Sequence, residues 1–149
     1  MVSLRLKLYG LVAKFNFAPL IKRLDKLGQL DAFIRAVKKN RKKIVQLNWA
    51  QLNAGKDANN RSLGRYKNFA YKHRLKPVDL YDTGDFRKAF EVEVDDTGIT
   101  IYSIDWKTDL LVDKYGENIF GLNATNAKKL FAIIKKDFEI NLKRNVGTR

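Results

Sequence analysis

Apolar residues recur at three- and four-residue steps between about Leu27 and Leu52, a pattern that predicts a long amphipathic helix. The apolar positions are Leu30, Phe33, Ile34, Val37, Ile44, Val45, Trp49 and Leu52. A basic turn around Arg41 interrupts the pattern. We expect the helix to end at NAGKDANNRSLG, because Asn and Gly favour turn and left-handed conformations that a helix cannot continue through.

A second helical stripe lies near the C-terminal end of the sequence. It consists of Leu130, Phe131, Ile134, Phe138 and Leu142. This spacing predicts a helix from Thr125, a candidate N-cap, to about Arg144. A shorter helix is expected in TDLLVDKYG, with Thr108 as a candidate N-cap and Gly116 as its stop.

Strict alternation in the middle of the chain predicts a β-hairpin. In AFEVEV, Phe90, Val92 and Val94 share one face, whereas Glu91 and Glu93 share the other. DDTG turns the chain and ITIYSI returns with its own alternation. A two-stranded ribbon is marginally stable alone, so a further strand or a helix must cover its apolar face. We therefore predict an α+β fold, with long amphipathic helices packed on a small antiparallel β-sheet built around this hairpin.

The first residues form a pattern of their own. SLRLKLY alternates Leu4, Leu6 and Leu8 with two basic residues, as in a half-buried strand or a short amphipathic segment that adheres to a neighbour. We expect residues 1–25 to form an N-terminal arm and residues 26–149 a single domain. No apolar run approaches the roughly 18 residues of a membrane span or the about 7–15 of a secretory signal, so we expect a protein made in the cytoplasm without a membrane partner. The absence of cysteine excludes disulfides and thiolate chemistry.

Charge is unevenly distributed along the chain. Lys and Arg number 30 against 16 Asp and Glu, a formal net charge of +14. Residues 1–45 carry twelve basic and two acidic side chains, whereas residues 82–118 carry four basic and ten acidic ones. Such a chain can attract polyanions, and its oppositely charged patches can also attract one another between subunits. Both interpretations stay open on the sequence alone.

Three patterns that could indicate chemistry have simpler explanations. The single histidine, His73, lies in a basic loop without cysteine, which favours a solvated loop histidine over a zinc ligand. GKDANNRSLG lacks the spacing of a phosphate-binding loop. Seven aspartates could in principle gather a magnesium ion, but turns and one helix face explain their placement better. These are Asp82, Asp85, Asp95, Asp96, Asp105, Asp109 and Asp113. We expect no catalytic residue, no metal site and no cofactor.

Two basic segments are candidates for contact with DNA. The run RAVKKNRKK could neutralise several phosphates, or it could be a solvated helix face. Its candidate DNA-facing residues are Arg35, Lys38, Lys39, Arg41, Lys42 and Lys43. In RYKNFAYKHRLK, the aromatic residues Tyr66, Phe69 and Tyr71 alternate with cations, and they either stack on bases or anchor the core.

The order of several short motifs adds a resemblance to a known family. LNAGKDANNRSLGRY, then DLYDTGDFRKAF, the hairpin and YSIDWKTDLLVDKYGENIFGL cover roughly residues 45–122. This arrangement resembles small virion morphogenesis proteins of tailed bacteriophages, the head–tail connector, neck or tail-completion group found in phages of Bacteroides-like hosts. The resemblance implies a non-enzymatic subunit of a homo-oligomeric ring through which DNA passes, located in the virion and made in the bacterial cytoplasm. Its partners would be other neck, portal or tail proteins.

Such a ring needs subunit contacts, for which the sequence offers candidates. A closed ring joins one patch to a different patch, so acidic and basic regions can complement each other. Glycines in YGENIFGL allow close approach of a partner, although Ile119 and Phe120 could equally fill the domain core. The candidate interface residues are Leu4, Leu6, Leu8, Glu91, Glu93, Tyr115, Ile119 and Phe120. The main alternative is a stand-alone basic nucleic-acid-binding module, and a metal-dependent nuclease comes third.

Overall fold

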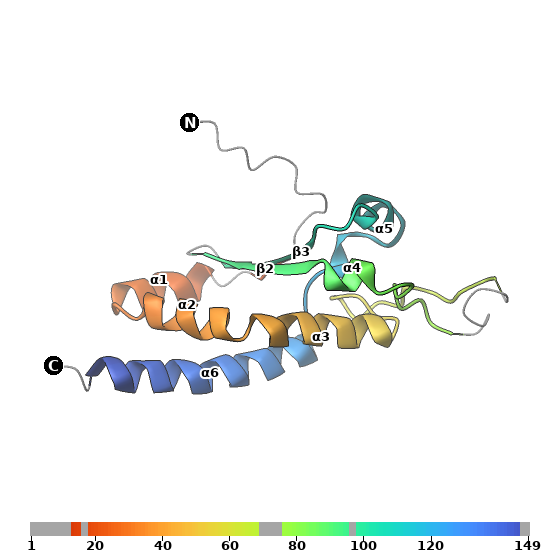
Figure 1. Ribbon diagram of the computed structural model, residues 1–149. Helices are drawn as coiled ribbons and strands as arrows, with labels where there is room; N and C mark the ends of the chain where they lie inside the picture. Colours follow the sequence, from red (N-terminus) through yellow and green to blue (C-terminus); the bar gives the residue numbers. More distant parts are fainter. Residues whose placement is uncertain (1–12, 16–17, 69–75, 96–97, 147–149) are drawn as a thin grey trace, which may run out of the picture.

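The computed structural model describes residues 13–15, 18–68, 76–95 and 98–146, and it shows an α+β domain in layers (Figure 1). A three-stranded antiparallel sheet has the order β1 (Ala13–Phe15), β3 (Ile99–Ser103), β2 (Phe90–Val94). The helices α2 (Leu30–Lys39) and α3 (Arg41–Asn53) contact the sheet through β2, and α6 (Ala124–Val146) contacts both helices from the other side. The predicted fold class is confirmed.

The predicted hairpin has the expected strands and register. Phe90 pairs with Ser103 and Val94 with Ile99, so the alternating apolar residues of both strands face the helices. β1 adds the third strand, with Ala13 opposite Ile101. This strand supplies part of the additional cover that a two-stranded ribbon requires.

The long helical pattern of residues 27–52 is divided in two at Asn40. The backbone there leaves the helical region, with φ −98° and ψ 14°. The Asn40 side chain donates to the carbonyl oxygen of Ala36 at 2.8 Å and to Asp137 on α6 at 2.7 Å, which fixes the bend against the next layer. The first of the two helices begins at Leu30, because Gly28 has φ +64° and ends the preceding helix.

Within residues 1–25, the range that the sequence analysis assigns to an arm, the structure describes β1 and nearly all of α1 (Ala18–Lys26), which extends one residue further. α1 packs on α2, with Ile21 and Leu24 buried. A nine-residue helix contributes only about two buried positions, too few to show a clear period in the sequence.

Two predicted helix caps are wrong, although the helices themselves exist. Thr125 is the second residue of α6, and the cap is Asn123, whose side chain accepts from the backbone N–H of Asn126 at 2.9 Å. Thr108 is the first residue of α5 (Thr108–Tyr115), and its side chain is buried instead of capping the helix. The Asp105 side chain accepts from the backbone N–H of Lys107 at 2.8 Å and orders this entry.

The core centres on three phenylalanine rings. Phe90 lies 5.0 Å from Phe86 and 5.2 Å from Phe120, measured between ring centroids. Phe86 belongs to the short helix α4 (Asp85–Lys88), and Phe120 follows the 3-10 turn η1 (Glu117–Ile119). Such aromatic pairs stabilise a core by about 0.5–1.5 kcal/mol beyond simple area burial. The cluster joins the hairpin to the segment that connects α5 with α6.

Candidate functional site

The charge reversal seen in the sequence becomes a separation of charge between two sides of the domain. The acidic residues 82–118 form α4, β2, β3, α5 and most of η1, whereas α1, α2, α3 and α6 carry fifteen basic and four acidic side chains. Figure 1 shows β2, β3 and α5 on one side of α2 and α3, and α6 on the other. The sheet side of α2 and α3 is therefore net acidic, whereas the helices α2 and α3 and the α6 layer beyond them are net basic.

Glu91 and Glu93 lie on the sheet face that points away from the helices. Both are exposed, and they pair across the hairpin with Tyr102 and Thr100. Burial raises the pKa of the Tyr102 hydroxyl, and the Glu93 and Glu91 carboxylates raise it further, while Arg41 partly offsets them. The face is an open acidic surface with a neutral phenol at its centre, suited to contact with a basic partner.

The six basic candidates lie across the junction of α2 and α3, and all are exposed. One of them is engaged within the chain, because the Lys39 ammonium lies 2.6 Å from the Asp137 carboxylate. Hydrogen bonds from Lys39 and Asn40 lower the pKa of Asp137. The other five candidates, Arg35, Lys38, Arg41, Lys42 and Lys43, extend from the same two helices into solvent.

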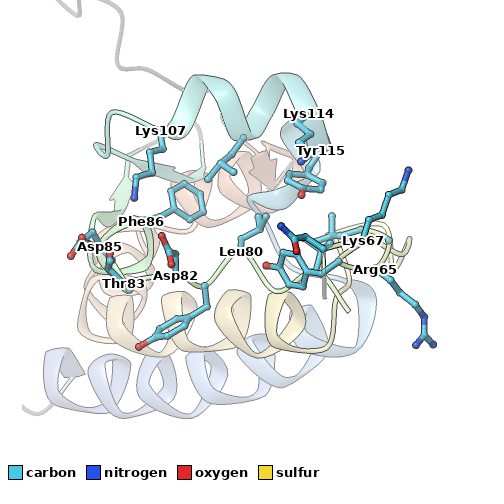
Figure 2. A pocket seen from close by; sticks show the side chains of 18 residues that line it. Arg65, Lys67, Leu80, Asp82, Thr83, Asp85, Phe86, Lys107, Lys114 and Tyr115 are labelled. Atoms are coloured by element: carbon cyan, nitrogen blue, oxygen red, sulfur yellow. Dashed lines mark hydrogen bonds between the residues drawn. The ribbon is translucent and has the colours of Figure 1, made fainter. Parts of the chain in front are cut away.

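A groove of about 700 Å³ lies between α5 and the turn before α4 (Figure 2). Leu80, Phe86 and Leu111 contribute apolar lining. In Figure 2, Lys107 extends from the start of α5 toward the side on which Asp82 and Asp85 lie. Arg65 and Lys67 lie at the opposite end. The groove therefore combines an apolar lining with charged side chains at both ends.

The turn TGDF that borders this groove has a specific backbone requirement. Gly84 has φ +89°, and a Cβ there would lie 3.2 Å from the Tyr81 ring. The Thr83 hydroxyl hydrogen-bonds the Asp85 carboxylate, which closes the turn. Behind it, the buried Arg87 donates to the Asn53 side chain and to the Asp79 carbonyl oxygen, both at 2.5 Å. Burial lowers the pKa of Arg87, and Asp79 and Tyr81 counteract part of this effect.

The proposed interface role of Ile119 and Phe120 is wrong, because both side chains are fully buried within the chain. They are core residues and are not available to a second subunit. Tyr115 is half-buried, lines the groove and has the Lys114 ammonium 5.2 Å from its ring centroid. Part of the Tyr115 side chain is therefore still accessible to a second subunit.

An amide clasp, formed by Asn48, Gln51 and Asn126, was not foreseen from the sequence. Asn48 on α3 donates to the Ile119 carbonyl at 2.9 Å and accepts from the Gly121 N–H at 3.0 Å. Gln51, one turn later, donates to the Gly121 carbonyl at 2.8 Å and accepts from the Asn123 N–H at 2.6 Å. Asn126 completes it with bonds to Gln51 and to the Leu47 carbonyl. The clasp holds the close of the KYGENIFGL motif, and its only sequence signal is three amides at apolar helix positions.

Several residues named in the sequence analysis lie outside the described residues. Leu4, Leu6, Leu8, His73, Phe69, Tyr71 and Asp96 fall there. Tyr66 is described, and its hydroxyl donates to the Asp79 carboxylate at 2.9 Å, which assigns it a structural contact.

The described part of the chain offers little basis for metal chemistry. There, no three His, Asp or Glu side chains come together in a way that could hold one metal ion. Asp109 and Asp113 are one turn apart on α5, but Asp105 precedes the helix and its carboxylate accepts from the backbone of Lys107. No helix within the same residues has the length and apolarity to cross a bilayer.

Comparison with known proteins returns no match: no family model, no curated protein and no solved structure is significantly similar to this chain.

Proposed function

We propose that this chain is a structural subunit of a tailed-bacteriophage virion and that its copies assemble into a ring at the head–tail junction or the top of the tail. DNA passes through this ring, and the neighbours are neck, portal or tail proteins. The motifs of residues 45–122 support the family, and the separation of acidic and basic sides supports the assembly.

The separation of charge is the observation that carries this proposal. Two copies related by a two-fold axis would place like-charged faces together if they met through either side, which is unfavourable. A head-to-tail contact places the acidic side of one copy, with Glu91 and Glu93, against the basic helices of the next. Repetition of such a contact closes into a ring or continues as a filament.

Charge reversal on the sheet tests this assembly. Glu91→Lys with Glu93→Lys should slow association in a salt-dependent manner, because exposed charges govern encounter more than affinity. The matched control is Asp25→Lys with Asp31→Lys, which changes the net charge equally on the basic side. Light scattering after dilution from high salt measures the rate. Equal slowing by both variants would show that net charge matters and the acidic face does not.

The location requires a separate experiment. The protein should be present in purified virions of a phage that encodes it, in an amount that corresponds to one ring per particle. Quantitative mass spectrometry measures this against the portal protein. Absence from intact virions would contradict the proposed function directly.

The stand-alone nucleic-acid-binding module remains the second candidate, favoured by the exposed basic residues at the α2–α3 junction. If each of the five residues that extend into solvent contacted one phosphate, the slope of log affinity against log salt would be roughly −4.5. Replacing Lys38, Arg41, Lys42 and Lys43 by Gln should reduce that slope by about 3 to 4. The same number of charges can be removed from α6 as a control, at Lys128, Lys129, Lys136 and Lys143. Tight DNA binding by a monomer would favour this alternative over the ring.

The proposed role is structural and not enzymatic. Purified protein should therefore leave DNA intact with magnesium or manganese. Metal-dependent cleavage that disappears in Asp105→Ala or Asp109→Ala would reverse this assignment, since those carboxylates would then be metal ligands.

A further inference from the structure

Three large apolar side chains project into solvent at the start of α5. Ile104 is 58% exposed, Trp106 74% and Leu110 61%. We call this group the α5 knob. The chain has two tryptophans, and the other, Trp49, packs against the core and lies 6.5 Å from Phe90. An exposed tryptophan that lies close in sequence to two exposed aliphatic residues is typical of a binding anchor.

The backbone beneath the knob is firmly held. Ile104 N–H donates to the Ala89 carbonyl at 3.0 Å, and Asp105 N–H donates to the buried Ser103 hydroxyl at 3.2 Å. The Asp105 side chain then orders Lys107, whose ammonium lies 5.6 Å from the Trp106 ring centroid. The knob is therefore presented on an ordered segment, which reduces the entropy lost when it binds.

An apolar groove lies at the other end of the molecule, between α1, α2 and α6. Its volume is about 450 Å³, and Phe131 at its edge is 52% exposed. The apolar lining consists of Leu20, Leu24, Phe33, Phe131, Ile134, Phe138 and Leu142. We call it the α1–α6 groove. In Figure 1, α1 and the C-terminal half of α6 lie at the opposite end of the domain from α5.

The segment that carries the knob is net acidic, whereas the helices that form the groove walls are net basic. Three acidic residues, Asp105, Asp109 and Asp113, and two basic residues, Lys107 and Lys114, lie among or next to the residues of the knob. The groove has Lys135 and Glu139 in its lining, and its walls belong to the basic helices α1 and α6. Distant positions on one chain and opposite charge together fit a contact between neighbouring copies, where a knob–knob contact would bring the aspartates together.

We propose that the α5 knob of one copy inserts into the α1–α6 groove of the next copy, with Trp106 as the main anchor. The inference rests on the proposed ring and specifies its subunit contact. The contact is head-to-tail, as ring closure requires, because the knob and the groove are different surfaces. The net acidic segment of the knob then lies against the net basic helices α1 and α6.

Cysteine cross-linking tests this pairing directly, because the chain contains no cysteine. Asp109→Cys marks the knob and Lys135→Cys marks the groove, and neither removes an apolar contact. A mixture of the two variants should give covalent dimers with a short bis-maleimide, whereas each variant alone should give none. The control is Gln46→Cys, exposed on α3, in place of Asp109→Cys. Dimers from either single variant alone would overturn the head-to-tail contact.

Truncation of the anchor supplies a second test. Trp106→Ala should weaken association at least about 30-fold while leaving the unfolding midpoint unchanged, because the side chain is exposed in the monomer. Leu110→Ala should weaken it less, and Leu27→Ala, at a leucine of similar exposure that does not line the groove, should have no effect. In a Trp49→Phe background, the emission of Trp106 should shift to the blue on assembly. Unchanged emission and affinity would overturn the role of the knob.

The outcomes separate this contact from the ring itself. If electron microscopy shows rings but knob and groove do not cross-link, the contact is wrong and the ring stands. Cross-linking of Leu6→Cys to Lys135→Cys, with none from Asp109→Cys, would assign the groove to the N-terminal arm and also overturn the contact. If the wild-type protein stays monomeric and is absent from virions, both the contact and the proposed function fail.

Discussion

The amide clasp makes the stability of this domain depend on one buried asparagine. Asn48 is fully buried, and its side chain bonds both the carbonyl of Ile119 and the N–H of Gly121. Asn48→Ala removes both bonds and leaves two backbone groups buried without these partners. We expect this single change to be among the most destabilising in the chain.

The expected loss follows from those two orphaned groups. Each unsatisfied buried polar group costs about 1–3 kcal/mol, so the pair costs roughly 2–5 kcal/mol after partial relaxation. The total stability of a domain of this kind is about 5–15 kcal/mol. At the middle of both ranges the variant should therefore lose about a third of its free energy of unfolding, and a domain at the low end of stability would be largely unfolded.

Urea unfolding followed by far-UV circular dichroism measures this loss. The control is Gln46→Ala, which removes an exposed amide from the same helix and should stay within about 0.5 kcal/mol of wild type. Asn48→Asp should not restore stability, because it keeps the acceptor for Gly121 but loses the donor to Ile119 and buries a charge. A loss below about 1 kcal/mol for Asn48→Ala would show that the clasp does not hold this segment.

Two further predictions concern a turn and a surface ion pair. In the same urea assay, Gly55→Ala should lower the free energy of unfolding clearly more than Gly28→Ala does. Both glycines have a positive φ, which costs a side-chain-bearing residue about 1–2 kcal/mol, but only at Gly55 would the new Cβ lie 2.5 Å from Pro77. Equal losses of stability would contradict this close approach. Asp137 has a folded-state pKa below the ordinary 3.8, so its contact with Lys39 stabilises the protein above that pH and the contribution disappears as pH falls through the lowered value. The stability difference between wild type and Asp137→Ala should therefore shrink in acid, and a difference that grows would refute the assignment.

Local patterns predicted the hairpin well because strand alternation and turn composition are both short-range signals. The residues expected in each strand form β2 and β3, with Phe90 opposite Ser103. β1 was outside the reach of such reasoning, since a three-residue strand acquires its identity by pairing with residues almost ninety positions away. The caps failed for a related reason. Thr125 and Asn123 are both acceptable caps, and the choice is influenced by Gln51, which binds the Asn123 N–H.

The candidate interface residues also differ in whether a short-range pattern could predict their exposure. Exposure of Glu91 and Glu93 follows from alternation, and the structure places both on the outward face. Ile119 and Phe120 stand in a short glycine-flanked run without a period, so the sequence alone could not separate core from interface. The decision comes from α3, whose amides capture the backbone on either side of Phe120. The knob was missed because the helical pattern of TDLLVDKYG does not show that Leu110 is uncovered, and because Ile104 and Trp106 lie between the hairpin and that helix, where no period separates buried from exposed positions.

The amide clasp holds, and the α5 knob belongs to, the segment of residues 103–126, but a mutation in the clasp should affect the stability of the fold and a mutation in the knob the association of subunits. α5 contacts η1, and the amide clasp fixes the chain at the end of that turn. Loosening the clasp should therefore disturb the position of the knob as well as unfold the domain, because both depend on where residues 103–121 lie. Trp106 has no such structural duty, since it is 74% exposed in the single chain. A change at Asn48 thus weakens folding first and association as a consequence, whereas a change at Trp106 weakens association while the monomer keeps its full stability.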